Sequence, residues 1–198
     1  ELESWFGEDW SSKRVFVLHT GGHSERSPQH GTCGKAFAEI PFDGTGRGIP
    51  GTILEAQLAQ LTPLAATLPP GVFVSCADVT LEFGNLGEVV SEDMYDAMRR
   101  GITALAHPSS VAIGEHHGVF ACDVDEVDAR VRAMRRGGPP TPLNCKRCLQ
   151  KPKEDEMRAK GCVMLGYSSG DDEWGLTDRC FHIGVAAIED LIDLSKTR

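Results

Sequence analysis

Apolar and β-branched residues fall in short runs, and glycines, prolines or acids end most of these runs. Residues 14–19, RVFVLH, are predicted to form a buried strand that stops just before the Gly21–Gly22 pair. The stretch GVFVSCADV, from residue 71, predicts a second buried strand that ends in an acid, Asp78. The same pattern predicts further strands at residues 102–106, 110–114, 118–122 and 162–167 and in a segment that ends at Gln150.

A helix is predicted at residues 51–68, where leucines recur near the helical spacing and Pro63 marks a break or kink. Residues 91–101 carry an initial serine, early acids, late arginines and a closing glycine, which are the signals of a short capped helix. Strands that alternate with helices predict an α/β domain with a mainly parallel sheet. Because ligands bind beyond the carboxyl ends of the strands in such sheets, Gly21 and Asp78 mark the expected site. Further helices are predicted at residues 123–138, 153–161 and 185–194.

The chain has 198 residues, enough for one sizeable domain, which we place at residues 14–198 after an N-terminal extension at residues 1–13. A formal net charge of −9 argues against sequence-independent binding of nucleic acid, although one small positive cleft can lie on an acidic body. No apolar run approaches the length of a membrane span. The sequence opens without Met or a signal-type apolar segment, as expected for a processed product or a piece of a longer protein.

The cysteines indicate the redox environment. There are seven, an odd number, and several lie inside apolar runs, where a free thiol behaves as a small buried hydrophobe. This usage favours a reducing compartment, which we take to be the cytoplasm, over a framework of disulfides.

The stretch HTGGHSERSPQHGTCGK, at the end of the first strand, has the features of a phosphate-binding loop. Gly21 and Gly22 let the backbone turn tightly and approach a ligand, so that its N–H groups can cradle phosphate oxygens. Ser24 adds a hydroxyl, while Arg26 and Lys35 add positive charge where a triphosphate is negative. The spacing matches neither GxxxxGK[ST] nor GxGxxG, and a plain Gly-Gly turn is the alternative interpretation.

The segment LHTGGHSERSPQHGTCGKAF resembles the signature of the fucose-1-phosphate guanylyltransferase and fucokinase family, whose usual form is close to LHAGGxSxRxPxxxxxGKxF. Further segments match in the family's order: PPGVFVSCADV, HHGVF, LQKPKEDEMRAKG and GLTDRCFHIGVAAIEDL. The similarity runs from about Val15 to Leu194. It implies a single Rossmann-like nucleotidyltransferase domain, in which helices flank a mixed, mainly parallel sheet.

The resemblance also implies a reaction. A sugar 1-phosphate, such as fucose 1-phosphate, would be joined to GTP with release of pyrophosphate. Such transfers depend on positioning and charge neutralisation more than on covalent help from the protein. Gly21, Gly22 and Ser24 would hold the nucleotide, and Arg26 and Lys35 would neutralise the triphosphate and the departing pyrophosphate.

The remaining motif residues are implied to bind the metal and the sugar phosphate. Asp78, with Asp178 as a second candidate ligand, would hold Mg²⁺, a hard cation suited to carboxylates and phosphate oxygens. Lys151, in the QKP motif, would meet the sugar phosphate. His117 and Gly118 would line the sugar side of the site.

A zinc site is a competing interpretation of the cysteines. Cys145 and Cys148 could begin such a site together with Cys162, Cys180 or His182. The resemblance, however, places Cys145 and Cys148 on the strand that enters Gln150. Because residues three apart on a strand point to opposite faces, this placement argues against one shared metal ion.

The sequence departs from the family pattern at three places, of which the first, Thr20 in place of the usual alanine, is a mild change. Glu25 puts an acid inside the phosphate loop, and Arg179 and Cys180 follow Asp178 where the family usually has Asp-Thr-Gly. Arg179 could pair with the Asp178 carboxylate and take the place of the metal. The alternative function is therefore a catalytically degenerate homologue that serves as a structural or interaction subunit of a larger assembly. The base also stays open, since a uridylyl- or cytidylyltransferase of the same fold would fit these residues.

Overall fold

The computed structural model describes most residues of the chain. They divide into two compact units, Glu1–Thr103 with Phe181–Arg198 (unit 1) and Ala104–Cys180 (unit 2). No helix among them is both long and apolar enough to cross a membrane. The described residues are 4, 7–20, 31, 34–41, 43, 46, 48, 50–77, 90, 92–137, 142–166 and 172–197.

Unit 1 is built on two adjacent parallel strands. β1 (Arg14–His19) pairs with β4 (Gly71–Cys76) along its whole length, and the rings of Phe16 and Phe73 stack with centroids 5.8 Å apart. The last residues of β9 (Glu173–Gly184) pair with the other edge of β4 in the antiparallel direction. The strands predicted from the first two apolar runs are therefore confirmed.

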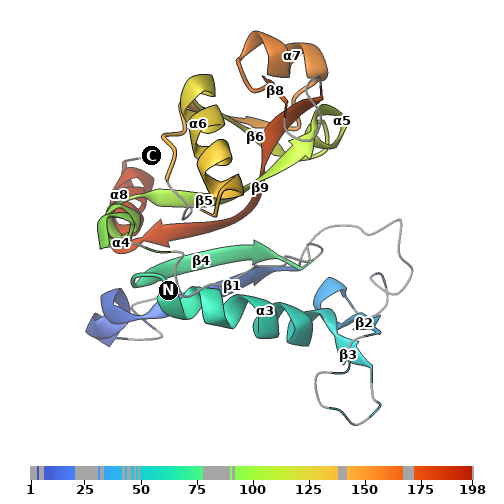
Figure 1. The fold of residues 1–198 in the computed structure, drawn as a ribbon. Coiled ribbons are helices and arrows are strands. Elements are labelled where there is room, and N and C mark those ends of the chain that lie inside the picture. Colours follow the sequence, from blue (N-terminus) through green and yellow to red (C-terminus); the bar gives the residue numbers. More distant parts are fainter. Residues whose placement is uncertain are drawn as a thin grey trace. The chain divides into compact units, whose positions relative to one another are not determined.

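The helix α3 (Ile53–Thr67) lies along β1 and β4 (Figure 1). A capping box starts it: Thr52 Oγ1 accepts the Glu55 N–H at 3.3 Å, and Glu55 Oε2 accepts the Thr52 N–H at 2.7 Å. The helix continues through Pro63, so the proline does not break it. Unit 1 also contains η1 (Gly7–Ser12), η2 (Lys35–Phe37), β2 (Glu39–Ile40), β3 (Gly51–Thr52), α4 (Glu92–Arg100) and α8 (Val185–Lys196).

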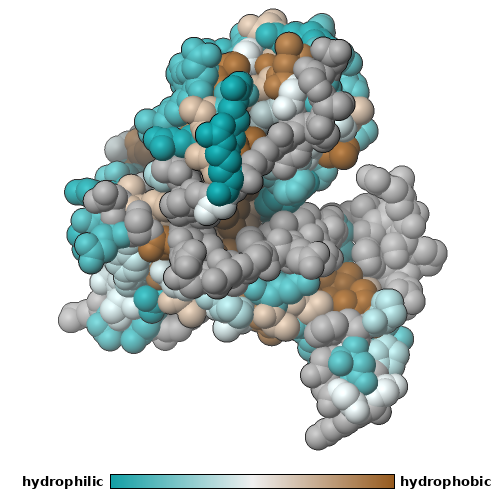
Figure 2. All heavy atoms as spheres, viewed as in Figure 1, coloured by the Kyte–Doolittle hydropathy of each residue, from teal (hydrophilic) through white to brown (hydrophobic). Residues whose placement is uncertain are grey.

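Unit 2 is centred on β6 (Gly118–Ala121), which lies between β7 (Arg147–Gln150) and β9 and runs antiparallel to both. Two more strands, β5 (Ile102–Ser110) and β8 (Met164–Leu165), also pair with β9. The helices of this unit are α5 (Val111–Gly114), α6 (Val124–Arg135) and α7 (Glu154–Ala159). Hydrophilic residues dominate the visible surface of α6 (Figure 2), where Arg132 and Asp128 form an ion pair at 2.6 Å.

The predicted α/β class is confirmed, but the prediction of a mainly parallel sheet is wrong. Hydrogen bonds join the strands in the order β1-β4-β9-β6-β7, with β5 and β8 paired to β9. Among the registers described, β1 with β4 is parallel, and β9 is antiparallel to β4, β6 and β8. The parallel sheet was predicted because helices alternate with strands along the sequence. A helix that connects two strands allows them to pair in parallel but does not require it. The chain after α6 is long enough to re-enter β7 antiparallel to β6.

Two of the predicted strands differ from the structure. Residues 110–114 contain α5 rather than a strand, because Val111 and Gly114 are both buried and are three residues apart, a helical spacing. The strand predicted at residues 162–167 is limited to Met164 and Leu165. The final helix, predicted at residues 185–194, is confirmed as α8.

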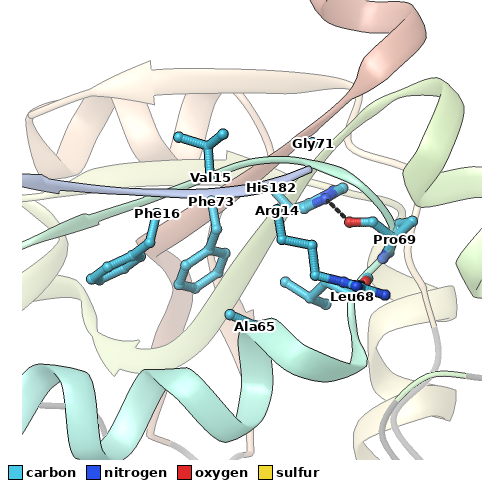
Figure 3. A pocket seen from close by; sticks show the side chains of 9 residues that line it. All are labelled: Arg14, Val15, Phe16, Ala65, Leu68, Pro69, Gly71, Phe73 and His182. Atoms are coloured by element: carbon cyan, nitrogen blue, oxygen red, sulfur yellow. Dashed lines mark hydrogen bonds between the residues drawn. The ribbon is translucent and has the colours of Figure 1, made fainter. Parts of the chain in front are cut away.

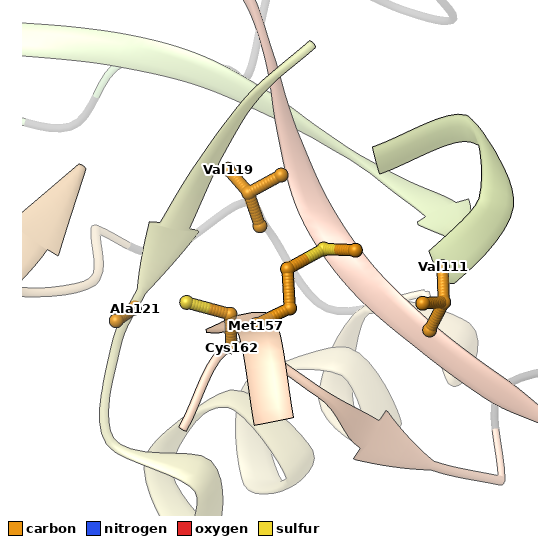
Figure 4. Packing of buried hydrophobic residues seen from close by; sticks show 5 residues of the cluster. All are labelled: Val111, Val119, Ala121, Met157 and Cys162. Carbon is orange, nitrogen blue, oxygen red and sulfur yellow. The ribbon is translucent and has the colours of Figure 1, made fainter. Parts of the chain in front are cut away.

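The core of unit 2 joins elements that are far apart in the sequence (Figure 4). Met157 of α7 is 1 % exposed and packs with Val119 of β6 and Cys162, which are 0 % and 1 % exposed. Val111 and Ala121 complete this cluster, and Leu149 of β7 packs against it. One deeply buried methionine thus holds the short helix α7 against β6. The same cluster packs against one face of β6 and β7.

Unit 1 encloses a cavity of about 30 Å³ beside His182 (Figure 3). Arg14 Nε donates to the Leu68 carbonyl at 2.6 Å, and His182 Nε2 lies 3.1 Å from the Pro69 carbonyl oxygen. This volume suits about one water molecule, whereas ligand sites occupy several hundred Å³. The cavity is therefore not a substrate site. Burial of the His182 ring lowers its pKa below the ordinary value of 6.5, with the Pro69 and Met98 carbonyls opposing the shift.

We expect the free energy of unfolding to fall as the pH drops below about 6.5. The unfolded chain protonates His182 near its ordinary pKa, whereas the folded chain, with the lower pKa, resists protonation. Stability is therefore lost as the pH falls through the unfolded value. Urea unfolding on either side of this pH measures the effect. His182→Gln should reduce the pH dependence, and His116→Gln, at an exposed position, is the control. An unchanged slope in His182→Gln would contradict the assignment.

Candidate functional site

The structure describes five of the ten candidate site residues. Lys35 is the first residue of η2 in unit 1, and the other four are in unit 2. Those four are His117, Gly118, Lys151 and Asp178. The candidates that lie outside the described residues are Gly21, Gly22, Ser24, Arg26 and Asp78.

The four candidates in unit 2 meet at the first residue of β6. Gly118 is opposite Gln150 of β7, and its N–H donates to Asp178 Oδ1 of β9 at 2.9 Å. Next to it, the Lys151 N–H donates to the His117 carbonyl at 3.0 Å. Three segments that are distant in the sequence thus bring one carboxylate, one lysine and the His-Gly turn together.

The Asp178 carboxylate occupies the space that a side chain on Gly118 would need. A Cβ atom at Gly118 would lie 2.5 Å from Asp178 Oδ2 and 2.8 Å from its Cγ. Glycine therefore allows the carboxylate to approach the backbone of β6 directly. The requirement for glycine in the HHGVF motif follows from this contact.

Gly118→Ala is expected to displace the Asp178 carboxylate and lower turnover on the order of 10²-fold, because a shift of about 1 Å at a reacting centre has that effect. The measurement is turnover in the reaction that the motif resemblance implies, followed as pyrophosphate release. Gly101→Ala is the matched control, since its new Cβ would lie 3.4 Å from the nearest atom, the Ala97 carbonyl oxygen. Full turnover in folded Gly118→Ala would show that the position of the carboxylate is unimportant.

Lys151 has an unusual backbone conformation. Its φ is 47°, the one positive value among the described residues other than glycine. The left-handed region costs an L-residue about 1–2 kcal/mol, and such strain tends to be retained at functional positions. The side chain is exposed, and its ammonium group forms no ion pair with a described residue. Lys151 is thus a cation available to a ligand at the end of β7.

The described part of this site can supply one carboxylate to a metal ion. No set of three or more His, Cys, Asp or Glu side chains among the described residues is arranged to hold a metal. Magnesium needs only one or two carboxylates when phosphate oxygens complete its shell. Asp178 Oδ1 is used by the Gly118 N–H, while Oδ2 accepts no hydrogen bond from a described residue. The chemistry of Asp178 therefore fits magnesium bound together with phosphate.

Comparison with known proteins identifies the family. The sequence profile of the fucose pyrophosphorylase domain matches residues 7–198. The chain belongs to the fucose pyrophosphorylase domain family. The resemblance drawn from the motifs is therefore confirmed.

Two curated relatives of this family member are guanylyltransferases. The chain is 33 % identical over 211 residues to the fucose-1-phosphate guanylyltransferase of Mus musculus, covering 99 % of this chain and 33 % of that protein. It is 35 % identical over 157 residues to the fucose-1-phosphate guanylyltransferase of Homo sapiens, covering 79 % of this chain and 23 % of that protein. The chain thus spans a third or less of the length of these relatives. No solved structure matches it significantly.

In this fucose pyrophosphorylase domain, Arg179 does not pair with the neighbouring carboxylate. Its Nη1 donates to the Asp178 backbone carbonyl at 3.1 Å, and its Nη2 lies 3.5 Å from Ser109 Oγ of β5. Alternation along β9 directs the two side chains away from each other. The expected competition between Arg179 and a metal at Asp178 is therefore not seen.

A polar network next to Asp178 joins β5 to β9, and it was not predicted from the sequence. Thr177, fully buried, donates through Oγ1 to the His107 carbonyl at 3.1 Å, so its oxygen accepts from Ser109 Oγ at 2.9 Å. Ser109 Oγ can then accept from Arg179 and from His107 Nδ1, which lies 3.4 Å away. Burial and the charge of Arg179 lower the pKa of His107. The sequence shows only polar residues inside predicted strand segments. The pattern of apolar residues does not indicate which of these polar residues contact one another.

Proposed function

We propose that this fucose pyrophosphorylase domain is a sugar-1-phosphate guanylyltransferase that joins fucose 1-phosphate to GTP and releases pyrophosphate. The observation that carries the proposal is the match of the family over residues 7–198, which includes the four candidates that meet at β6. Both curated relatives carry the name fucose-1-phosphate guanylyltransferase.

In the proposed reaction, a phosphate oxygen of the sugar 1-phosphate attacks the α-phosphorus of GTP. The bond from the α-phosphorus to the oxygen bridging to the β-phosphate breaks, and pyrophosphate leaves with those electrons. The nucleophile is already an anion, so the step needs no general base. It needs cations and fixed geometry, because charge accumulates around the α-phosphate in the transition state.

The residues of unit 2 would serve the sugar phosphate. The Lys151 ammonium would bind its phosphate, and the backbone bond between Lys151 and His117 at 3.0 Å would hold that lysine beside the His-Gly turn. His117 and Gly118 would border the sugar. Asp178 would hold Mg²⁺, which when bound neutralises phosphate charge. The hydrogen bond that the Gly118 N–H donates to Asp178 Oδ1 at 2.9 Å would orient the Asp178 carboxylate.

The phosphate loop would serve the nucleotide. Gly21, Gly22 and Ser24 would bind the phosphates of GTP through backbone N–H groups and a hydroxyl. Arg26 and Lys35 would neutralise the pyrophosphate as it departs, and Asp78 would be a ligand of Mg²⁺.

Pyrophosphate release in the presence of GTP, fucose 1-phosphate and Mg²⁺ tests the proposal. We expect release only when all three are present, and less with UTP, CTP or ATP in place of GTP. Calorimetry with GTP and Mg²⁺ accompanies the assay. If the chain released no pyrophosphate at any Mg²⁺ concentration, whether or not it bound GTP, the result would instead support the alternative function as a structural or interaction subunit. Faster release with another nucleotide would overturn the assignment of guanine.

A further inference from the structure

Cys145 lies at the centre of a group of thiols around the start of β7. Its side chain interacts electrostatically with those of Cys122, Cys148 and Cys162, all in unit 2. The Cys145 Sγ–H donates to the Arg147 carbonyl at 3.2 Å, which fixes the side chain at the start of β7, and the Cys145 thiol contributes to the raised pKa of the Cys122 thiol. All four cysteines are free thiols in the structure. The guanylyltransferase proposal gives none of them a role.

The backbone keeps Cys122 and Cys145 next to each other. In the antiparallel ladder of β6 and β7, Ala121 is opposite Arg147, and the Lys146 N–H donates to the Ala121 carbonyl at 2.8 Å. On the other side of Cys122, Asp123 Oδ2 pairs with the Lys146 ammonium at 3.0 Å. Lys146, the residue after Cys145, thus binds both neighbours of Cys122, through one backbone hydrogen bond and one ion pair. Cys122 directly follows β6 and Cys145 lies two residues before β7, so these bonds hold their backbones side by side at the ends of the two paired strands. A disulfide requires backbones that approach closely.

We propose that Cys122 and Cys145 form a reversible dithiol–disulfide site that reacts with small disulfides such as glutathione disulfide. The Cys145 thiolate attacks one sulfur of glutathione disulfide, which gives a mixed disulfide and releases one glutathione thiolate. The Cys122 thiolate then attacks Cys145 Sγ, forms the Cys122–Cys145 bond and releases the second glutathione thiolate. The two thiol protons of the protein end on the two glutathione molecules, so that two thiols are oxidised and one disulfide is reduced.

The environments of the two thiols set the order of the steps. Cys145 is exposed and can meet a soluble disulfide, whereas Cys122 is half-buried. Burial, followed by the charge of Cys145, raises the pKa of Cys122 to about 11. Formation of the mixed disulfide removes the charge of Cys145, which makes Cys122 easier to deprotonate for the second step.

The two other thiols of the group are poorer partners. Cys162 is 1 % exposed within the core cluster, where it packs with Met157. Burial, followed by the charge of Asp178, raises the pKa of Cys148. Cys148 lies on β7 opposite Phe120 and is exposed, as Cys145 is. It is therefore the matched control: an exposed thiol on β7 that is not among the groups acting on Cys122.

The experiment exposes the full chain to glutathione disulfide, blocks the remaining thiols and maps the cross-linked peptides without reduction. We expect a Cys122–Cys145 cross-link in the native chain and in Cys148→Ser, reversed by dithiothreitol. Cys122→Ser should stop at glutathione attached to Cys145, and Cys145→Ser should lose the cross-link. Circular dichroism before oxidation establishes that each variant is folded.

Several results would overturn the proposal. They are a native chain that gains only glutathione adducts or does not react, a cross-link to Cys148 or Cys162 instead, and a cross-link that disappears in folded Cys148→Ser. Because the native chain and the Cys148→Ser control are both read directly, a poorly folded Cys122 or Cys145 variant does not leave the question open. The result is also independent of pyrophosphate release.

Discussion

Asp178→Asn is expected to lower turnover by about 10²-fold or more while leaving the fold intact. The asparagine side-chain oxygen can still accept the Gly118 N–H that Asp178 Oδ1 accepts at 2.9 Å. What disappears is the negative charge, which in the proposed mechanism holds Mg²⁺ at the phosphates. Pyrophosphate release measured against Mg²⁺ concentration should show the loss at every concentration of metal.

Asp178→Ala separates the structural role of this carboxylate from its role in the reaction. The alanine variant leaves the buried Gly118 N–H without its acceptor, which should cost about 1–3 kcal/mol of unfolding free energy. We therefore expect the two variants to differ in urea unfolding and to be similarly inactive. Asp190→Asn, an exposed carboxylate on α8, is the control. Normal turnover in Asp178→Asn would reduce Asp178 to a structural partner of β6.

The strands of unit 1 could be predicted because their own residues determine them. β1 and β4 are continuous apolar runs that end at polar or small residues, so the local pattern is sufficient. β9 was not recognised as one long strand, since Thr177, Asp178, Arg179 and His182 interrupt its apolar pattern. Apart from the Asp178 carbonyl, which is adjacent to Arg179, their hydrogen-bond partners lie 60 to 113 residues away in the sequence, beyond the reach of any local pattern.

The candidate site was partly predictable for a related reason. The motif residues His117, Gly118, Lys151 and Asp178 were chosen by resemblance, and the structure brings them together. Residues that only support the site have no motif, so the Ser109–Thr177 contact at 2.9 Å could not be foreseen. Strand direction was missed because the order of helices and strands fixes connectivity, whereas direction depends on where the chain re-enters the sheet.

Lys151 should show opposite effects on stability and on activity. Since φ at this residue is 47°, Lys151→Gly relieves left-handed strain that Lys151→Ala keeps, and we expect the glycine variant to be the more stable by about 1 kcal/mol. Both variants lose the ammonium group. Each should raise KM for fucose 1-phosphate and lower kcat/KM on the order of 10²-fold.

The charge and the backbone of Lys151 can be tested separately. Lys151→Arg keeps the positive charge and should recover part of the activity, although a planar guanidinium does not reproduce the point charge of an ammonium. Lys160→Ala, at an exposed lysine directly after α7, is the control and should behave as the native chain. Steady-state kinetics with varied fucose 1-phosphate and urea unfolding give the two readouts. If the glycine and alanine variants kept native kcat/KM, the lysine would not bind the sugar phosphate, and its conformation would serve only the hydrogen bond to the His117 carbonyl.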